Sequence, residues 1–369
     1  MHDSWQIGRL FGIPLRVHMS WLIVFGLISW SLAAGYLPAQ LPDLPVWSYW
    51  LKAVLATTMF FFSIILHELG HSLVARHYGI GIASITLFVF GGVSRMKEEP
   101  SHARQELQIA LVGPIISLGL AAMFGVLSAL AAPNPLGVVL TYLTVVNLLV
   151  AVFNMLPAFP LDGGRVLRAL LWMRSGDRMR ATHTAARIGR LLALALIAFG
   201  VVRLLGGNAG GLWLIFIGWF IIQAGSASVA QASLRQALGG LRVRDVMTTE
   251  VRTVPADATL HDLIENYFIR YTYGGYPVVD DGRVVGLVTL HELRNTPVEG
   301  RAATRVERVM VPLGAGLVVD PGTPVVDALD RMVTGGVGRL VVLERDRLVG
   351  LITANGILHL TQTRSSLGG

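Results

Sequence analysis

The sequence predicts a polytopic α-helical membrane protein of about six transmembrane helices, followed by a soluble α/β module at the C-terminus. Hydrophobic residues make up 53% of the 369 residues and charged residues only 14%, whereas a soluble domain carries about 25% charged residues. The apolar excess lies within residues 1–225. Beyond residue 242 two similar segments follow each other with a period of about 63 residues, which is typical of duplicated modules.

Six apolar runs account for the predicted transmembrane helices. A helix needs about 20 apolar residues to cross a bilayer, and the last of these runs is short. Most of the runs are apolar on all faces, which argues against helices on a protein surface. The runs are 20–36, 51–75, 107–131, 136–156, 188–205 and 210–224.

The connections between these runs alternate in charge. Lys and Arg are absent from 37–50, 132–135 and 206–210, whereas 76–104 and 165–190 are rich in basic residues. Because basic loops stay in the cytoplasm, we expect a multi-pass protein of the cell membrane with both termini in the cytoplasm. The second and fourth spans then both end on the cytoplasmic side.

Composition also limits the ligands and partners. The chain has no cysteine, so a metal must be held by His, Asp or Glu. The net charge of +7 is explained by arginines that face the cytoplasm and anionic lipid of the bilayer. No platform of aromatic and basic residues is visible of the kind that nucleic-acid sites use, so we expect no nucleic-acid partner.

A metal-binding pattern lies within the second span. Its sequence HELGH places His67 and His71 on one helical face, where both can bind one metal ion. Imidazole nitrogen suits zinc, and Glu68 is placed to act as a general base on a water. The alternative is a helix whose two histidines are satisfied by neighbours, but ionisable residues at this depth are costly and usually functional.

Asp162 is the candidate for a third metal ligand. A catalytic zinc site takes three protein ligands and keeps one position open. Asp162 is the one acidic residue in 107–176, and it follows the fourth span. Pro157 and Pro160 break that helix, and the two glycines after Asp162 are expected to let the backbone turn sharply. A helix-end cap in water is the alternative role of Asp162.

Three motifs together carry a family resemblance: HELGH at 67–71, GPIIS at 113–117 and NMLPAFPLDG at 154–163. Residues 1–224 resemble the site-2 protease family of intramembrane metalloproteases. The resemblance implies that His67, His71 and Asp162 bind one Zn²⁺ per chain. It also implies that Glu68 is the catalytic base.

Asn154 is a second catalytic candidate, on the resemblance alone. The family uses an Asn near the Asp motif to orient the substrate or to stabilise the oxyanion, and Asn154 is the matching position. Asn147, seven residues earlier on a similar face, is the weaker candidate, and an interhelical hydrogen bond is its alternative role. The small residues of GPIIS are expected to serve close helix packing, and His77 is expected at the membrane interface.

Residues 80–96 predict a β segment that would hold the substrate in an extended form. Within them, 85–93 predicts a strand followed by a Gly-rich turn. A strand edge beside the metal would pair with an extended substrate, and the site-2 protease family has such a re-entrant β loop. An amphipathic connection on the membrane surface is the alternative.

The two repeated segments, 243–297 and 306–362, resemble cystathionine β-synthase (CBS) domains. We expect a membrane domain at 1–225, a linker at 226–242 and a tandem CBS module at 243–369.

Tandem CBS modules often bind adenine nucleotides, so the resemblance implies AMP or ATP as a ligand, with Thr289 and Thr353 as candidate phosphate contacts. The family's ribose-binding Asp, three residues after the Thr, is replaced by Glu292 and by Gly356, and Gly356 cannot supply that contact. A structural module that forms a homodimer is the alternative.

These patterns predict an intramembrane zinc metalloendopeptidase that cleaves transmembrane segments of membrane proteins and is regulated by adenine nucleotide. By resemblance, its substrates are single-span regulators such as anti-sigma factors, or remnant signal peptides. The alternative from another functional class is a membrane transporter or channel that is gated by the nucleotide-sensing CBS module at the C-terminus. The convergence of intramembrane polar residues on two spans favours the protease, and retention of Glu68 argues against a relative that only binds membrane helices.

Overall fold

The computed structural model describes residues 4–89, 91–131, 134–271, 273–314 and 316–366. The chain forms two compact units, Met1–Gln231 and Ala232–Gly369. The first unit is mainly helical and the second is α/β.

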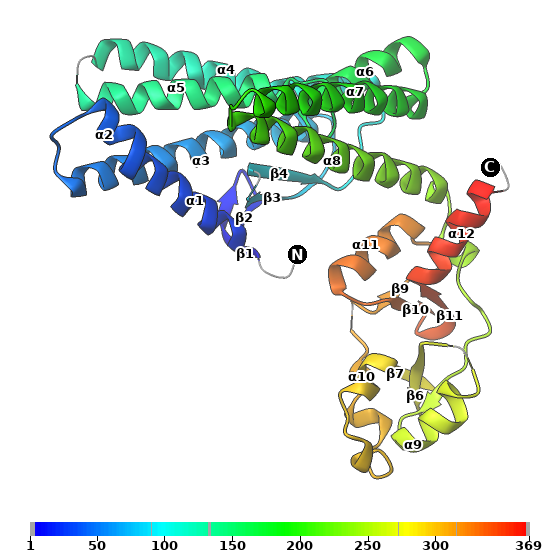
Figure 1. Cartoon of the computed structure of the whole chain (residues 1–369). Helices are drawn as coiled ribbons and strands as arrows, with labels where there is room; N and C mark the ends of the chain where they lie inside the picture. The colour runs from blue at the N-terminus through cyan, green and yellow to red at the C-terminus, as the bar shows by residue number, and fades with distance from the viewer. Residues whose placement is uncertain (1–3, 90, 132–133, 272, 315, 367–369) are drawn as a thin grey trace. The chain divides into compact units, whose positions relative to one another are not determined.

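The described part of the first unit contains long helices and one small sheet (Figure 1). Helix α1 continues through a π-helical segment, Leu32–Tyr36, into the short α2. The helices are α1 (Met19–Ser31), α2 (Leu37–Gln40), α3 (Val46–His77), α4 (Ala103–Ala131), α5 (Pro135–Asn154), α6 (Asp162–Ser175), α7 (Arg178–Leu205) and α8 (Gly210–Leu238).

Six helical stretches among the described residues are long and apolar enough to cross a membrane, which confirms the predicted fold class. They are Met19–Gln40, Val46–His77, Ala103–Ala131, Pro135–Asn154, Arg178–Leu205 and Gly210–Leu238. The polar flanks of several apolar runs are also helical, so these helices are longer than the runs. The last apolar run, which is short in sequence, is the start of a helix that continues to Leu238.

A four-stranded sheet accompanies the helices, in the order β1-β2-β3-β4. The hairpin of β1 (Ser4–Leu10) and β2 (Ile13–His18) comes from the N-terminus, and the hairpin of β3 (Ile82–Phe88) and β4 (Gly91–Met96) follows α3. Strands β2 and β3 run parallel, and the other neighbours are antiparallel.

The sheet packs against α3. Ile13, Leu15 and Ile85 form a buried cluster with Leu69 of α3. The N-terminal strands were not predicted. The pairing of β2 with β3 joins residues about 70 positions apart, which local patterns do not reveal. Strands β1 and β2 pair locally, but their two-residue turn at Phe11 and Gly12 lacks the Asn-Gly or Asp-Gly sequence that usually marks a hairpin. The expected Gly-rich turn is also different: Gly91 begins β4, so the second strand starts where the turn was predicted. Phe90, part of that predicted segment, lies outside the described residues.

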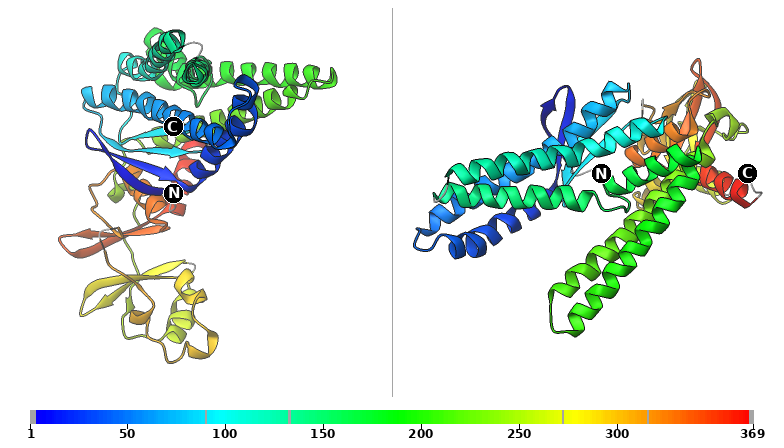
Figure 2. Two further views of the ribbon diagram at one scale, coloured as in Figure 1. Left: turned by 90° about the vertical axis from the view of Figure 1, so that its left-hand side faces the viewer. Right: turned by 90° about the horizontal axis from the view of Figure 1, so that it is seen from above.

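Helix α4 packs against α3, α5 and α6, and it is the element that joins the parts of the site described below. Figure 2 shows α4 beside α5 and α7 beside α8 as two antiparallel pairs. In the second pair the backbones approach closely, because an added Cβ at Gly200 or Gly218 would meet backbone oxygen of the facing helix at 2.6–2.7 Å. Small residues at such contacts let membrane helices pack without side chains between them.

The second unit contains two similar α/β halves. The first has the strands β5 (Val254–Pro255), β6 (Gly275–Asp280), β7 (Arg283–Thr289) and β8 (Val311–Pro312), with helices α9 (Leu260–Leu263) and α10 (Leu290–Arg294). The second has β9 (Val318–Val319), β10 (Arg339–Glu344) and β11 (Arg347–Thr353), with α11 (Val325–Gly335) and α12 (Ala354–Ser366). In each half a short parallel strand precedes an antiparallel hairpin.

The two halves exchange their leading segments. Met247, which precedes the first half, lies against Gly350 of the second, and Met310, which precedes the second half, lies against Gly286 of the first. A side chain at either glycine would overlap the methionine sulfur, at 2.5 and 2.6 Å. The two halves therefore form one interlocked unit and not two independent domains.

Candidate functional site

Three buried side chains from two helices converge in the first unit. His67 and His71 lie one turn apart on α3, and Asp162 is the first residue of α6. The Asp162 Oδ2 atom lies 3.1 Å from His67 Nε2 and 3.2 Å from His71 Nε2, and the two Nε2 atoms are 3.2 Å apart. Their residues are only 3–8% exposed. The structure thus brings together all three predicted metal ligands.

The spacing fits a zinc ion. Ligand atoms about 2.0–2.1 Å from a tetrahedral ion lie about 3.3 Å from one another, close to the three distances above. Three nitrogen and oxygen donors leave one tetrahedral position for water or substrate, as catalytic zinc sites do. This donor set is the one group of three such side chains found among the described residues.

Helix α4 fixes the orientation of both imidazoles. His71 Nδ1 lies 2.5 Å from the Ile109 carbonyl oxygen, to which it must donate, and His67 Nδ1 lies 2.9 Å from Ser117 Oγ. These contacts occupy the Nδ1 atoms and leave the Nε2 atoms directed at the shared point. Such outer contacts set the tautomer and the ring orientation of histidine ligands.

Gly113 provides the space beside the two rings. A Cβ at this position would overlap Nε2 of both His67 and His71. Gly113 and Ser117 were predicted to serve helix packing, whereas in the structure both contact the histidines. Their one-turn spacing on α4 is a signal in the sequence, but it becomes informative only when the partner helix is known.

Asp162 reaches the histidines because the helical structure is interrupted in the segment before it. Helix α5 ends at Asn154, and residues 155–161 lead into α6 without regular structure. Gly163 and Gly164 are helical and do not form the sharp turn that was predicted. Their role is close packing, because an added Cβ at Gly164 would come within 2.5–2.7 Å of the Ala158 and Phe159 backbone.

The two neighbouring imidazoles favour the ionised form of the Asp162 carboxyl group. Burial raises the pKa of the Asp162 carboxyl, but hydrogen bonds to His67 and His71, with the charges of the two imidazoles, outweigh it and hold the pKa below its usual range. A carboxylate with its charge retained is the form that binds a metal cation.

Glu68 lies between α3 and the sheet. It is half-buried, and its Cγ faces Gly92 of β4, where an added Cβ would lie 2.6 Å away. Its carboxylate is near enough to act electrostatically on His71. The predicted base therefore sits beside the ligand cluster and next to an edge strand.

The two candidate asparagines, Asn154 and Asn147, differ in their burial and hydrogen bonding. Asn154 is half-buried at the end of α5, and among the described residues no hydrogen bond joins its side chain to the cluster. Asn147 is fully buried and donates Nδ2 to the Leu143 carbonyl oxygen of its own helix at 2.8 Å, so this bond lies within α5 and is not the interhelical bond considered as its alternative role. His77 is exposed at the end of α3, away from the cluster.

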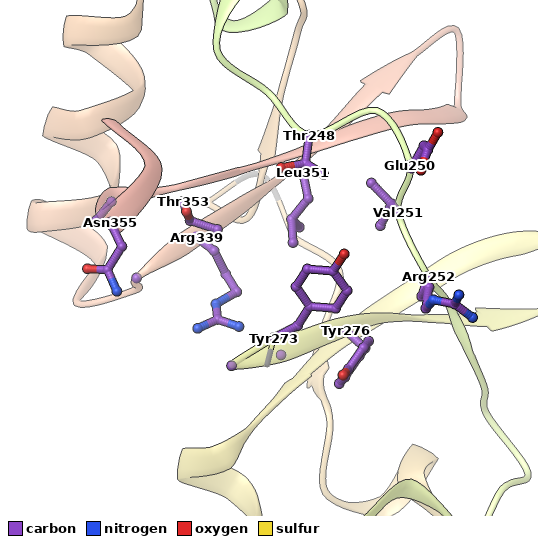
Figure 3. Close-up of a pocket in the computed structure, with 14 residues that line it drawn as sticks. Thr248, Glu250, Val251, Arg252, Tyr273, Tyr276, Arg339, Leu351, Thr353 and Asn355 are labelled. Carbon is purple, nitrogen blue, oxygen red and sulfur yellow. The ribbon is translucent and has the colours of Figure 1, made fainter. Parts of the chain in front are cut away.

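The described residues of the second unit line at least two cavities. One, of about 500 Å³, is lined by Thr353, Asn355, Tyr273 and Arg339 among others. Figure 3 shows Arg339 and Thr353 pointing into this cavity from the second half, with Tyr273 from the first half. The other, of about 390 Å³, is lined by Thr289 and also by Arg339. The two predicted threonines thus belong to separate cavities that share one arginine.

The environments of the two threonines are unequal. Thr289 Oγ1 donates to Glu292 Oε2 at 2.5 Å, and the same carboxylate accepts from the Thr289 backbone N–H at 2.8 Å. Thr353 Oγ1 accepts from the Gly356 N–H at 3.0 Å. Glu292, at the position of the family's ribose-binding Asp, is therefore engaged in capping its own helix α10.

A membrane-embedded fold with a buried His, His, Asp donor set and an adjacent glutamate defines the class of zinc-dependent hydrolases. Comparison with known proteins supports this class. The family model described as peptidase family M50 matches residues 55–136 and 128–196, and the CBS domain model matches residues 243–299 and 306–362.

Relatives cover nearly the whole chain. A protein of Mycobacterium tuberculosis named as a zinc metalloprotease, Rip3, is 39% identical over 98% of this chain and 93% of its own length. Zinc metalloprotease MJ0392 of Methanocaldococcus jannaschii is 29% identical over 97% of this chain and 96% of its own. A solved structure, the site-2 protease from the same archaeon, is 31% identical and covers 61% of this chain and 94% of that one, with a TM-score of 0.43.

The chain belongs to peptidase family M50: it is a multi-pass membrane zinc metalloprotease of the site-2 protease family that carries a pair of CBS domains.

Proposed function

We propose that the protein cleaves transmembrane segments of membrane proteins at a single zinc ion held by His67, His71 and Asp162. The observation that carries this proposal is the buried triangle of donor atoms, 3.1–3.2 Å on each side. Bound there, zinc would polarise the scissile carbonyl and lower the pKa of a water to about 7. The family assignment favours this function over the gated transporter considered from the sequence.

Glu68 would act as the general base. It accepts the proton of the attacking water and delivers that proton to the leaving amine. Its place on α3, one residue after His67 and against Gly92 of β4, supports this role. Asn154 would donate a hydrogen bond to the negative charge that develops on the carbonyl oxygen.

A substrate helix must be unwound before cleavage, because its carbonyls are shielded by its own hydrogen bonds. Strand β4 is an edge of the sheet, and an unwound segment would add to that edge as a further strand. Since β4 contacts Glu68 through Gly92, the added strand would pass beside the base. The edge strand supports a substrate that is cleaved in extended form, and by family resemblance we propose single-span regulators such as anti-sigma factors, or remnant signal peptides.

We propose the cell membrane as the location, with both termini in the cytoplasm, on the distribution of basic residues. The second unit would bind AMP or ATP and regulate cleavage, and it would pair with a second copy of the chain. The two cavities, their threonines and the shared Arg339 support an anionic ligand.

The decisive test is Glu68→Gln in purified, full-length protein. We expect zinc content to match the wild type, while cleavage of a model transmembrane substrate falls by about 10²–10⁴-fold. Glu98→Gln, on an exposed residue after β4, is the matched control and should cleave normally. Wild-type turnover by the Glu68 variant would rule out the proposed mechanism.

A further inference from the structure

One face of α4 contacts the side chains of the proposed metal centre over about two turns. The Ile109 carbonyl accepts from His71, Gly113 lies against both Nε2 atoms, and Ser117 bonds His67. Residues three or four apart share a helix face, so the next residue of this series toward the N-terminus is Glu106. Its side chain is completely buried. A carboxylate in such a position requires a partner.

The partner of Glu106 comes from α6, the helix that begins with Asp162. Arg168 donates both Nε, at 2.8 Å, and Nη2 to the same oxygen, Glu106 Oε1. The Arg168 guanidinium also lies over the ring of Phe159, 5.1 Å from its centroid, and its side chain is 11% exposed. The pair therefore joins α4 both to α6 and to the segment that leads into α6.

Stability alone does not explain this pair. Removing two charges from water costs about as much as their attraction returns, so a buried ion pair adds little stability compared with apolar residues of similar size. The second oxygen of Glu106 has no hydrogen-bond partner among the described residues, which adds to that cost. What a buried pair with two directed hydrogen bonds does supply is geometry.

The geometry matches the needs of the metal centre. Glu106 and Gly113 are about 10 Å apart along α4, and Asp162 and Arg168 are about 9 Å apart along α6, at 1.5 Å per residue. The two packed helices are thus joined directly by the Glu106–Arg168 pair and, at a nearly equal spacing along each helix, through the imidazoles of α3 that both Gly113 and Asp162 contact. A slip of α6 by one turn would move Asp162 by about 5.4 Å, beyond the reach of the histidine Nε2 atoms.

We propose that Glu106 and Arg168 are positioning residues that fix the register of α6 against α4 and thereby hold Asp162 at the metal centre. The inference rests on the proposed function only in requiring that the three side chains bind zinc. It concerns metal affinity and not the cleavage step.

The test measures zinc in the full-length protein in detergent, by metal content and by the rate of zinc loss to a chelator. We expect Arg168→Gln and Glu106→Gln to lose zinc at least about 10-fold faster, which is the lower end of the effect of losing a direct contact to a metal ligand. Arg168→Lys keeps the charge without the two-pronged geometry and should fall between them and the wild type. Arg174→Gln, on an exposed arginine of the same helix, is the matched control and should retain zinc normally.

The double variant Glu106→Met with Arg168→Met separates register from stability. It leaves no unpaired buried charge and is expected to stay folded, so loss of zinc with a native melting profile supports the proposal. Wild-type zinc retention in any folded variant without the pair would overturn it, and so would failure of all these variants to fold. A wild-type protein that binds no zinc would instead refute the proposed function itself.

Discussion

At the scale of single residues, the site depends on the absence of a side chain as much as on the ligands. Gly113 contacts the Nε2 atoms of His67 and His71 from the side of α4, and any Cβ would overlap them. A side chain there can be accommodated only if an imidazole turns away, and a ligand that turns away is lost from a metal site whose geometry is strict.

We therefore predict that Gly113→Ala abolishes zinc binding, with zinc content below about one tenth of the wild type, in line with the effects of altered outer contacts. The measurement is metal content of the purified protein. Gly119→Ala, on the same helix at a position where an added Cβ meets no atom within 4 Å, is the control. Normal zinc content in both variants would show that the rings do not use the space beside Gly113.

The sequence predicted the three clustered side chains as metal ligands because two kinds of local signal point to them. His67 and His71 share a helix face by spacing alone, and Asp162 is the sole acid in a long apolar region. Gly113 and Ser117 carry no such signal, because small residues on a membrane helix are ordinary packing residues. Their role depends on the pairing of α4 with α3, which a single sequence does not encode locally.

At the scale of elements, strand β4 is docked on α3 through the contact between Gly92 and Glu68. An added Cβ at Gly92 would lie 2.6 Å from Glu68 Cγ and 3.2 Å from Ile64 Cγ2, so one of the two elements must shift. Because His67 and His71 are held by α4 and not by β4, that shift should move the proposed base and leave the proposed zinc site intact.

We expect Gly92→Ala to keep its full zinc content while turnover falls by about 10-fold or more, since displacement of a catalytic group by about 1 Å costs up to 10²-fold. Zinc content and cleavage rate measured on the same preparation distinguish this result from that of Gly113→Ala. Loss of zinc from the Gly92 variant would contradict the assignment of separate roles to β4 and α4.

The elements themselves were predicted unevenly. Long apolar runs predict long helices because crossing a membrane requires them, and six were found. The β1–β2 hairpin was missed, because its turn at Phe11 and Gly12 has no usual hairpin sequence and because β2 pairs with β3 across a wide gap in sequence. The duplication at the C-terminus was visible as a repeat, but the exchange of Met247 and Met310 between halves needed the structure.

At the scale of the whole molecule, the second unit presents a cation suited to an anionic ligand. Arg339 lines both cavities, and no hydrogen bond or ion pair holds its guanidinium among the residues that the structure describes. Burial lowers the pKa of Arg339, and the charge of Glu292 only partly opposes this. A phosphate group in either cavity would supply the hydrogen bonds that the guanidinium lacks.

We predict that Arg339→Ala weakens AMP or ATP binding to the full-length protein by roughly 10- to 150-fold, because a hydrogen bond to a charged group contributes about 1.5–3 kcal/mol. Calorimetry in detergent measures the affinity, and Arg347→Ala, on an exposed arginine of β11 outside both cavities, is the control. Zinc content should be equal in all three proteins, since the metal ligands belong to the first unit. If nucleotide regulates cleavage through these cavities, its effect on the cleavage rate disappears in the Arg339 variant and persists in the control. If the wild-type chain bound neither nucleotide, the protease assignment would stand, and the second unit would have a structural role only.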